Sequence, residues 1–115
     1  MRRMKKILIT GATGFIGKAL TRHLSETDFQ VRVLIHPSST SPDLPKGIPV
    51  EATVSGLNDL RGLRAALVGV DIVYHLASQE ALGARGDLLE TDIKGTRNLV
   101  QAAQESDVKR FIYLS

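Results

Sequence analysis

The stretch ILITGATGFIGKAL at residues 7–20 constrains the fold of this chain more than any other segment. A short apolar run leads into three glycines, Gly11, Gly14 and Gly17, and an amphipathic segment follows them. A strand, a glycine-rich turn and a helix in this order gather backbone N–H groups and the positive end of a helix dipole at one point, which favours a phosphate group. We therefore predict an anion-binding turn between a buried strand and the first helix.

The spacing of the three glycines indicates which phosphate ligand the turn suits. Gly11 permits a sharp exit from the strand, Gly14 lets the backbone approach a pyrophosphate, and Gly17 lets the helix pack closely on the sheet. This division of roles predicts a dinucleotide. The plain alternative is a strand–helix turn that holds no ligand.

The pair Gly17-Lys18 resembles the end of a P-loop, which binds nucleoside triphosphates. That motif requires glycine at position 12 and Ser or Thr at position 19, and both positions hold alanine. Lys18 would then have no partner that binds magnesium, so the P-loop interpretation is disfavoured.

Strand-like and helical segments alternate along the whole chain. Strands are expected at 6–10, 31–35, 50–54, 71–76 and 110–114, and helices at about 14–26, 58–68 and 87–105. This alternation predicts an α/β fold, a doubly wound parallel Rossmann-like sheet of about five strands in the order 3-2-1-4-5, formed by a single domain over residues 1–115. A ligand should then lie at the carboxyl ends of the first and fourth strands.

The apolar pattern predicts which side chains the helices bury. The first helix is expected to bury Phe15, Ile16, Ala19, Leu20, His23 and Leu24, and the last helix Leu89, Ile93, Thr96, Val100 and Ala103. Asn58 or Asp59 is expected to cap the second helix, and Asp87 with Glu90 to form a capping box on the third.

Three further side chains lie in predicted strands near the sheet's core. Tyr74 and Tyr113 are expected to be core residues. His75 ends the fourth strand, where burial against the neighbouring helix is favoured over contact with a cofactor.

Charge and composition exclude several classes of function. The formal net charge is +3, but Arg2, Arg3, Lys5 and Lys6 supply that excess, so we predict no nucleic-acid partner. No apolar run is long enough to cross a bilayer, so no membrane partner is expected either. The sequence has no cysteine, so no thiolate metal site is possible, no metal site is predicted, and a cytoplasmic location is expected.

The end of the second predicted strand bears on the choice between NAD and NADP. An acidic residue there would accept the ribose 2′-hydroxyl and favour NAD, but the sequence reads IHPSS and has no carboxylate before Asp43. His36 and Ser38 are candidates to donate to a 2′-phosphate, with Arg32 or Lys46 as further candidates if the loop folds back. We therefore predict an NAD(P) cofactor and favour NADP. The alternative is that His36 merely ends a strand.

Four segments together resemble the extended or atypical short-chain dehydrogenase/reductase superfamily, which contains nucleotide-sugar epimerases and dehydratases. They are ITGATGFIG (9–17), LPKGIPVEATVSGLND (44–59), GVDIVYHLAS (69–78) and TDIKGTRNLVQAAQESDVKRFIYLS (91–115). The resemblance covers nearly the whole chain. The sequence departs from the family pattern in having Gly56 where Asp is usual, which removes an adenine contact, and Asp92 where Asn is frequent.

The resemblance also implies particular cofactor contacts. They come from the backbones of Thr13, Gly14, Phe15 and Ile16, from Leu57 near the adenine, and from Leu76, Ala77 and Ser78 beside the nicotinamide ribose.

The family's catalytic residues are not expected within these 115 residues. The family places a catalytic Ser or Thr just after the fifth strand and a Tyr-x-x-x-Lys pair further on, whereas neither tyrosine here has Lys four residues later. We therefore predict no catalytic residue in the chain, which corresponds to the amino-terminal, cofactor-binding part of the family.

Two functions remain open at this point. One is the dinucleotide-binding portion of an NAD(P)-dependent nucleotide-sugar epimerase, dehydratase or reductase. The other is a non-catalytic NAD(P)-binding sensor or scaffold. Because the fifth strand forms an edge with an apolar sequence, self-association is also expected.

Overall fold

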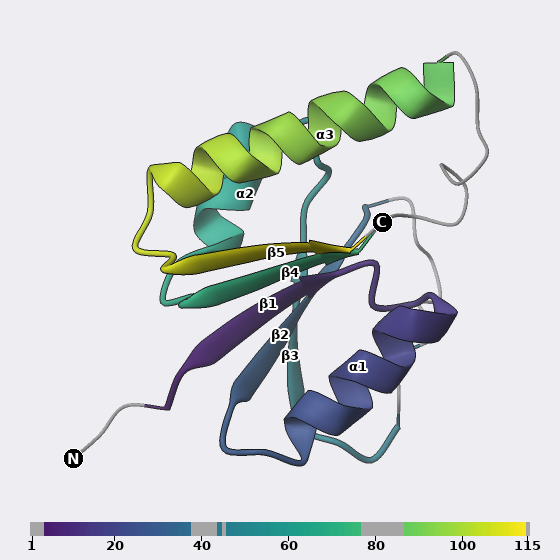
Figure 1. Cartoon of the computed structure of the whole chain (residues 1–115), viewed down its shortest axis with the longest axis vertical. Helices are drawn as coiled ribbons and strands as arrows, with labels where there is room; N and C mark the ends of the chain where they lie inside the picture. The colour runs from purple at the N-terminus through teal and green to yellow at the C-terminus, as the bar shows by residue number, and fades with distance from the viewer. Residues whose placement is uncertain (1–3, 38–43, 45, 77–86, 115) are drawn as a thin grey trace.

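The computed structural model describes residues 4–37, 44, 46–76 and 87–114, and describes side chains of the last helix from Ile93 onward. Five parallel strands form one sheet in the order β3-β2-β1-β4-β5, as predicted. Helices α2 and α3 cover one face of the sheet and helix α1 covers the other (Figure 1). The glycine-rich turn enters α1 at the carboxyl edge of the strands.

The element bounds lie within two residues of those expected from the sequence. The strands are β1 Lys6–Thr10, β2 Gln30–Ile35, β3 Val50–Val54, β4 Ile72–Leu76 and β5 Arg110–Leu114. The helices are α1 Phe15–Ser25, α2 Leu60–Ala66 and α3 Asp87–Gln104.

Each face of the sheet has its own apolar cluster. Leu8 and Val73 pack with Leu63 and Leu99 beneath α2 and α3. On the other face Ile7, Ile9, Val31 and Val33 are among the buried residues that pack with Leu24 of α1. Strand β1 is buried on both faces because it lies at the centre of the sheet, which explains its nearly continuous apolar sequence.

Helix α1 buries Leu24 and half-buries Leu20 as predicted, but the rest of its predicted face differs. Its buried residues are Gly17, Thr21 and Leu24, whereas Phe15 and Ile16 are 80% and 64% exposed. The predicted face was therefore wrong for its first turn, and also for Ala19 and His23, which are exposed. The cause is the close contact of Gly17 with the turn, which leaves the two large residues before it outside the interface.

The buried face of α3 also differs from the prediction. Gly95, Leu99, Ala102 and Ala103 are buried, whereas Ile93 is 45% exposed. Thr96 and Val100 are half-buried beside this face. Gly95 of this face lies against Leu57, and Leu99 is the large side chain that enters the apolar cluster. The side chains of Leu89 and of the predicted Asp87–Glu90 capping box lie outside the described part of the helix.

The other predictions about single side chains had mixed outcomes. Asp59 caps α2 through a hydrogen bond from Gly62 N to its carboxylate at 3.1 Å, as predicted. Tyr74 is half-buried against the α1-side cluster. Tyr113 is 47% exposed, so its assignment to the core was wrong, because β5 is an edge strand in the described sheet.

Arg32 on β2 connects the sheet to the end of α2 by hydrogen bonds. Its Nη1 donates to the carbonyl oxygens of Ala66 and Val68 at 2.6 and 2.9 Å, and its Nε donates to Glu51 Oε2 at 2.9 Å. Lys6 Nζ reaches the same carboxylate at 3.1 Å. A cation at a helix C-terminus is favoured by the helix dipole. Arg32 therefore has a structural role, and its candidate role as a 2′-phosphate ligand stays a prediction.

We expect Arg32→Met to lower the free energy of unfolding by about 2 kcal/mol, because charge-assisted hydrogen bonds to two helix-end carbonyls are lost. Arg64→Gln is the matched control. Arg64 pairs with Glu105 while both side chains are more than 40% exposed, so the loss of this pair should cost far less than the loss of Arg32. Urea unfolding of the three proteins measures both values, and equal losses would contradict this role of Arg32.

The contribution of Glu51 should also depend on pH. Hydrogen bonds from Arg32 and then Lys6 hold the pKa of Glu51 below its usual value of 4.5. Because the pKa is lowered in the folded state, this stabilisation is present above the unfolded-state pKa and is lost as pH falls through the folded-state value. The stability difference between wild type and Arg32→Met should therefore narrow in acid.

Candidate functional site

The candidate site is built on the turn between β1 and α1. Gly11 has φ +69, in the left-handed region that favours glycine. A Cβ at this position would lie 3.0 Å from Leu76 Cβ and 3.1 Å from Leu76 O. The turn therefore rests directly on the end of β4, and Gly14 N donates to Gly11 O at 3.2 Å to close it.

Gly17 and Gly14 have opposite surroundings. A Cβ at Gly17 would lie 2.0 Å from Gly11 O and 2.7 Å from Ala12 Cα, so no side chain fits there. Among the described residues, a Cβ at Gly14 would meet only Gly11 O, at an ordinary 3.5 Å. Packing among the described residues therefore does not require glycine at position 14.

The first turn of α1 completes the anion-binding geometry. Gly14 is the N-cap residue, and it has no side chain to cap the helix. The first N–H groups of any α-helix lack partners within the helix, and here no acidic side chain of the first turn compensates for them. Backbone donors and the positive helix end thus point to one place, as a pyrophosphate requires.

The segment after β3 approaches the same edge of the sheet. Asn98 Nδ2 on α3 donates to Leu57 O at 2.8 Å, and a Cβ at Gly95 would lie 2.8 Å from Leu57 Cβ. Leu57 is thereby fixed against α3. A Cβ at Gly56 would lie 2.7 Å from Asn58 Oδ1, so the Asn58 side chain occupies the place beside the position where the family usually has Asp.

The structure brings seven of the twelve predicted site residues together at the turn. Gly11, Thr13, Gly14, Phe15, Ile16 and Gly17 form the turn and the start of α1. Leu76 lies under Gly11, and His36 is exposed directly after β2. Ser38, Ala77 and Ser78 lie outside the described residues.

The sequence prediction missed a buried polar cluster beneath the turn. Thr10 Oγ1 is 2.6 Å from His75 Nδ1, and His75 Nε2 is 2.8 Å from Thr96 Oγ1 on α3. His75 is only 2% exposed, so its predicted burial against the helix is confirmed. The one signal in the sequence was Thr10 itself, a polar residue that ends a buried strand directly before the turn.

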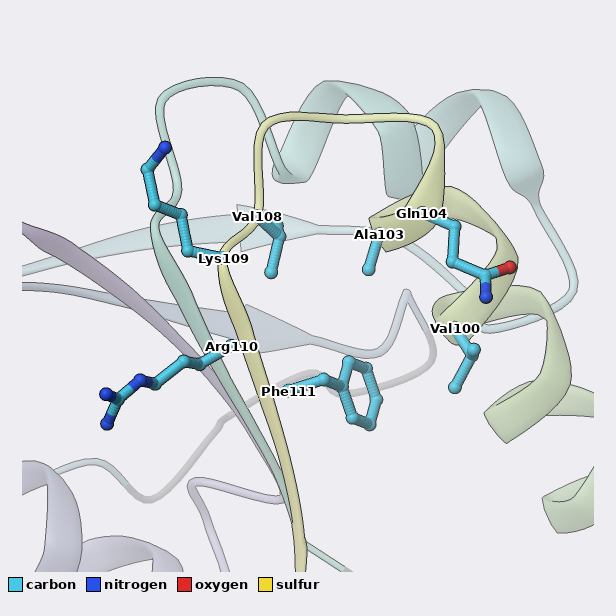
Figure 2. Close-up of a pocket in the computed structure, with 7 residues that line it drawn as sticks. All are labelled: Val100, Ala103, Gln104, Val108, Lys109, Arg110 and Phe111. Carbon is cyan, nitrogen blue, oxygen red and sulfur yellow. The ribbon is translucent and has the colours of Figure 1, made fainter.

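The described residues contain a shallow cleft of about 220 Å³ away from this site. It lies between the end of α3 and the start of β5, where Phe111 faces Val100 and Ala103 (Figure 2). Strand β5 begins at the end of the sheet opposite the carboxyl ends of the strands, where the glycine turn lies (Figure 1). We therefore assign this cleft no role in binding a dinucleotide.

The described residues hold neither a cluster of metal-ligating side chains nor a helix that could span a membrane. Among them there is no group of three His, Cys, Asp or Glu side chains that could hold a metal ion. No helix in the same part of the chain is both long and apolar enough to span a membrane.

Comparison with known proteins agrees with this geometry. The model of the NAD dependent epimerase/dehydratase family matches residues 7–115. Sterol demethylase protein B of Methylococcus capsulatus is 37% identical over 110 residues, which cover 94% of this chain and 33% of that protein. The 3-beta-hydroxysteroid dehydrogenase of Mycolicibacterium neoaurum is 30% identical over 116 residues, covering 94% of this chain and 31% of that protein.

A solved structure shows the same arrangement of strands and helices. The UDP-N-acetylglucosamine 4-epimerase from Bacillus cereus aligns with a TM-score of 0.74 at 29% identity, over 95% of this chain and 36% of that chain. This chain thus spans about a third of the length of the relatives it matches. The family match over nearly all of its residues, together with the glycine turn and the strand order, shows that the chain belongs to the NAD-dependent epimerase/dehydratase family.

Proposed function

We propose that this chain binds the pyrophosphate of NAD(P) at the β1–α1 turn and forms the cofactor half of a reductase, epimerase or dehydratase. The contrast between Gly17, which is tightly packed, and Gly14, which is open beside the helix end, carries this proposal. The bound cofactor would supply hydride transfer at a sugar or carbonyl carbon. The chain's own residues orient it: the backbone of Thr13 to Ile16 donates to phosphate, while Leu57 and Leu76 contact the adenine and nicotinamide sides.

The substrate would be a nucleotide sugar or another carbonyl compound. Family membership supports this class, and the Bacillus cereus neighbour is named a UDP-N-acetylglucosamine 4-epimerase. The Mycolicibacterium relative is named a hydroxysteroid dehydrogenase, which leaves a non-sugar carbonyl within the proposal. A cytoplasmic location is proposed on the lack of cysteine in the sequence.

NADP is the favoured cofactor. No acidic side chain follows β2 directly, and His36 is exposed at that point. Calorimetric titration of the chain with NADP⁺ and NAD⁺ should give a lower Kd for NADP⁺, and a tenfold preference for NAD⁺ would overturn the assignment.

We expect His36→Asp to reverse the preference, because a carboxylate accepts from the ribose 2′-hydroxyl and repels a 2′-phosphate. The Kd for NADP⁺ should rise by about tenfold or more while that for NAD⁺ changes little. His23→Asp is the matched control, since His23 is exposed on α1 and not at the end of β2. Equal effects of the two substitutions would argue against a role for His36.

A non-catalytic sensor or scaffold is the second candidate. The position usually held by Asp is Gly56, and Asn58 occupies the space beside it, which weakens the usual adenine contact. Both candidates predict dinucleotide binding with little turnover by this chain alone. NADPH oxidation by these 115 residues with any carbonyl substrate would contradict both predictions, because no acid/base dyad of the family is assigned here.

We also propose that the chain self-associates through β5. Tyr113 and Leu114 are 47% and 43% exposed on this strand, which pairs only with β4 in the described sheet. Light scattering should show dimers or larger species at high concentration, and Tyr113→Lys should shift them toward monomer. Val54→Lys, at an exposed apolar position on the opposite edge strand, is the control. A monomeric wild type would refute the proposal.

A further inference from the structure

His75 is an almost fully buried polar side chain near the candidate site. It is 2% exposed, and its ring lies between Thr10 of β1 and Thr96 of α3. The rings of Tyr113 and Phe111 on β5 lie 5.2 and 6.1 Å from it, measured between centroids. One imidazole thus contacts three different elements besides its own strand.

The contacts of Thr10 favour one of the two neutral tautomers of this imidazole. Thr10 Oγ1 accepts from Leu76 N at 3.2 Å and lies 2.6 Å from His75 Nδ1. These are the partners of the Thr10 hydroxyl in the part of the chain that the structure describes. Thr10 is buried, so its own proton needs an acceptor, and Nδ1 is the acceptor within reach. The remaining ring proton is then on Nε2, which donates to Thr96 Oγ1.

The Thr10–His75–Thr96 hydrogen bonds are connected to the glycine turn through Leu76, which contacts both Thr10 and Gly11. The Leu76 amide is held by Thr10, and the Cβ and carbonyl of Leu76 are the atoms on which Gly11 rests. Thr10 and His75 are also register partners across β1 and β4, so these hydrogen bonds fix the two strand ends at the point where the sheet's ligand should lie. A shift of the Thr10 hydroxyl would therefore move both Leu76 and the turn.

We propose that His75, as a neutral imidazole protonated on Nε2, is a positioning residue that sets the spacing between the glycine turn and the end of β4. It does this by accepting the Thr10 hydroxyl proton, while its bond to Thr96 anchors it to α3. This inference rests on the proposed dinucleotide function for its effect on affinity, but its structural part can be measured without cofactor.

Three substitutions distinguish the effects of the two hydrogen bonds of the His75 ring, one to Thr10 and one to Thr96. His75→Leu removes both bonds, His75→Asn restores an acceptor near the place of Nδ1, and Thr96→Val removes only the bond to α3. We expect His75→Leu to raise the Kd for dinucleotide by about tenfold, whereas His75→Asn and Thr96→Val should stay within about threefold of wild type. Should His75→Leu fail to fold, Thr10→Val breaks the same bond from the other side, and Thr10→Ser should restore it.

The readouts distinguish this role from general stabilisation. Nitrogen-15 NMR of the wild-type imidazole should show protonated Nε2 and unprotonated Nδ1. Exchange of the Leu76 amide should accelerate in His75→Leu or Thr10→Val but not in Thr96→Val. A proton on Nδ1, or equal changes in all variants, would overturn the proposal. If wild type binds no dinucleotide, the proposed function fails, while the tautomer and the Leu76 exchange still decide this inference.

Discussion

Gly17→Ala should destabilise the chain by about 3 kcal/mol, which is a large part of the stability of a domain of this size. The added Cβ would lie 2.0 Å from Gly11 O and 2.8 Å from Gly11 C, and both are backbone atoms that cannot rotate away. Alanine in a helix gains only about 1 kcal/mol over glycine. The clash therefore outweighs the gain in helix propensity. Urea unfolding measures the loss, and a variant as stable as wild type would contradict the observed packing of α1 on the turn.

Gly69→Ala helps to separate this clash from the effect of adding any methyl group. Gly69 follows α2 with φ +78, and a Cβ there would meet no atom of the described residues within 4 Å. The Gly69→Ala substitution should lower the free energy of unfolding by about 1 kcal/mol, through backbone strain alone. The difference between the two variants isolates the contact with Gly11 and Ala12.

Gly14→Ala should have the opposite effect, because it should weaken dinucleotide binding while changing the free energy of unfolding little. Gly14 has φ −76 and ψ 173, which alanine adopts, and its Cβ would meet Gly11 O at an ordinary 3.5 Å. The free energy of unfolding should fall by about 1 kcal/mol or less. The methyl group would instead occupy the space where a pyrophosphate approaches the helix end, so we expect the Kd for dinucleotide to rise by at least about tenfold.

Calorimetric titration and urea unfolding of the same Gly14→Ala preparation test both halves of this prediction. Unchanged affinity would show that the ligand does not approach Gly14. A large loss of stability would show that Gly14 is needed for folding, in which case its openness would not indicate a ligand.

The sequence predicted the sheet well because its signals were local and strong. The buried run before Gly11 and the alternation of strands with helices predicted a parallel, doubly wound sheet, for which 3-2-1-4-5 is an expected strand order. The roles of Gly11 and Gly17 were also readable, because a left-handed φ and a forbidden Cβ each demand glycine.

The helix faces were less predictable because packing depends on side-chain size as well as hydrophobicity. Phe15 and Ile16 belong to an apolar stripe, yet Gly17 makes the closest contact and leaves them exposed. The hydrogen bonds among Thr10, His75 and Thr96 could not be predicted from the sequence. Thr10 and His75 are 65 residues apart, and His75 and Thr96 are 21 residues apart, so they meet only when β1, β4 and α3 assemble.

The central claim is that the carboxyl edge of β1 and β4 holds a dinucleotide. Amide chemical shifts during titration of the labelled chain with NADPH test it most directly. We predict that the changes concentrate at Gly11 to Gly17, His36, Leu57 and Leu76, while Val100 and Phe111 at the distant cleft stay unchanged. No saturable change, or changes centred on that cleft, would contradict the account.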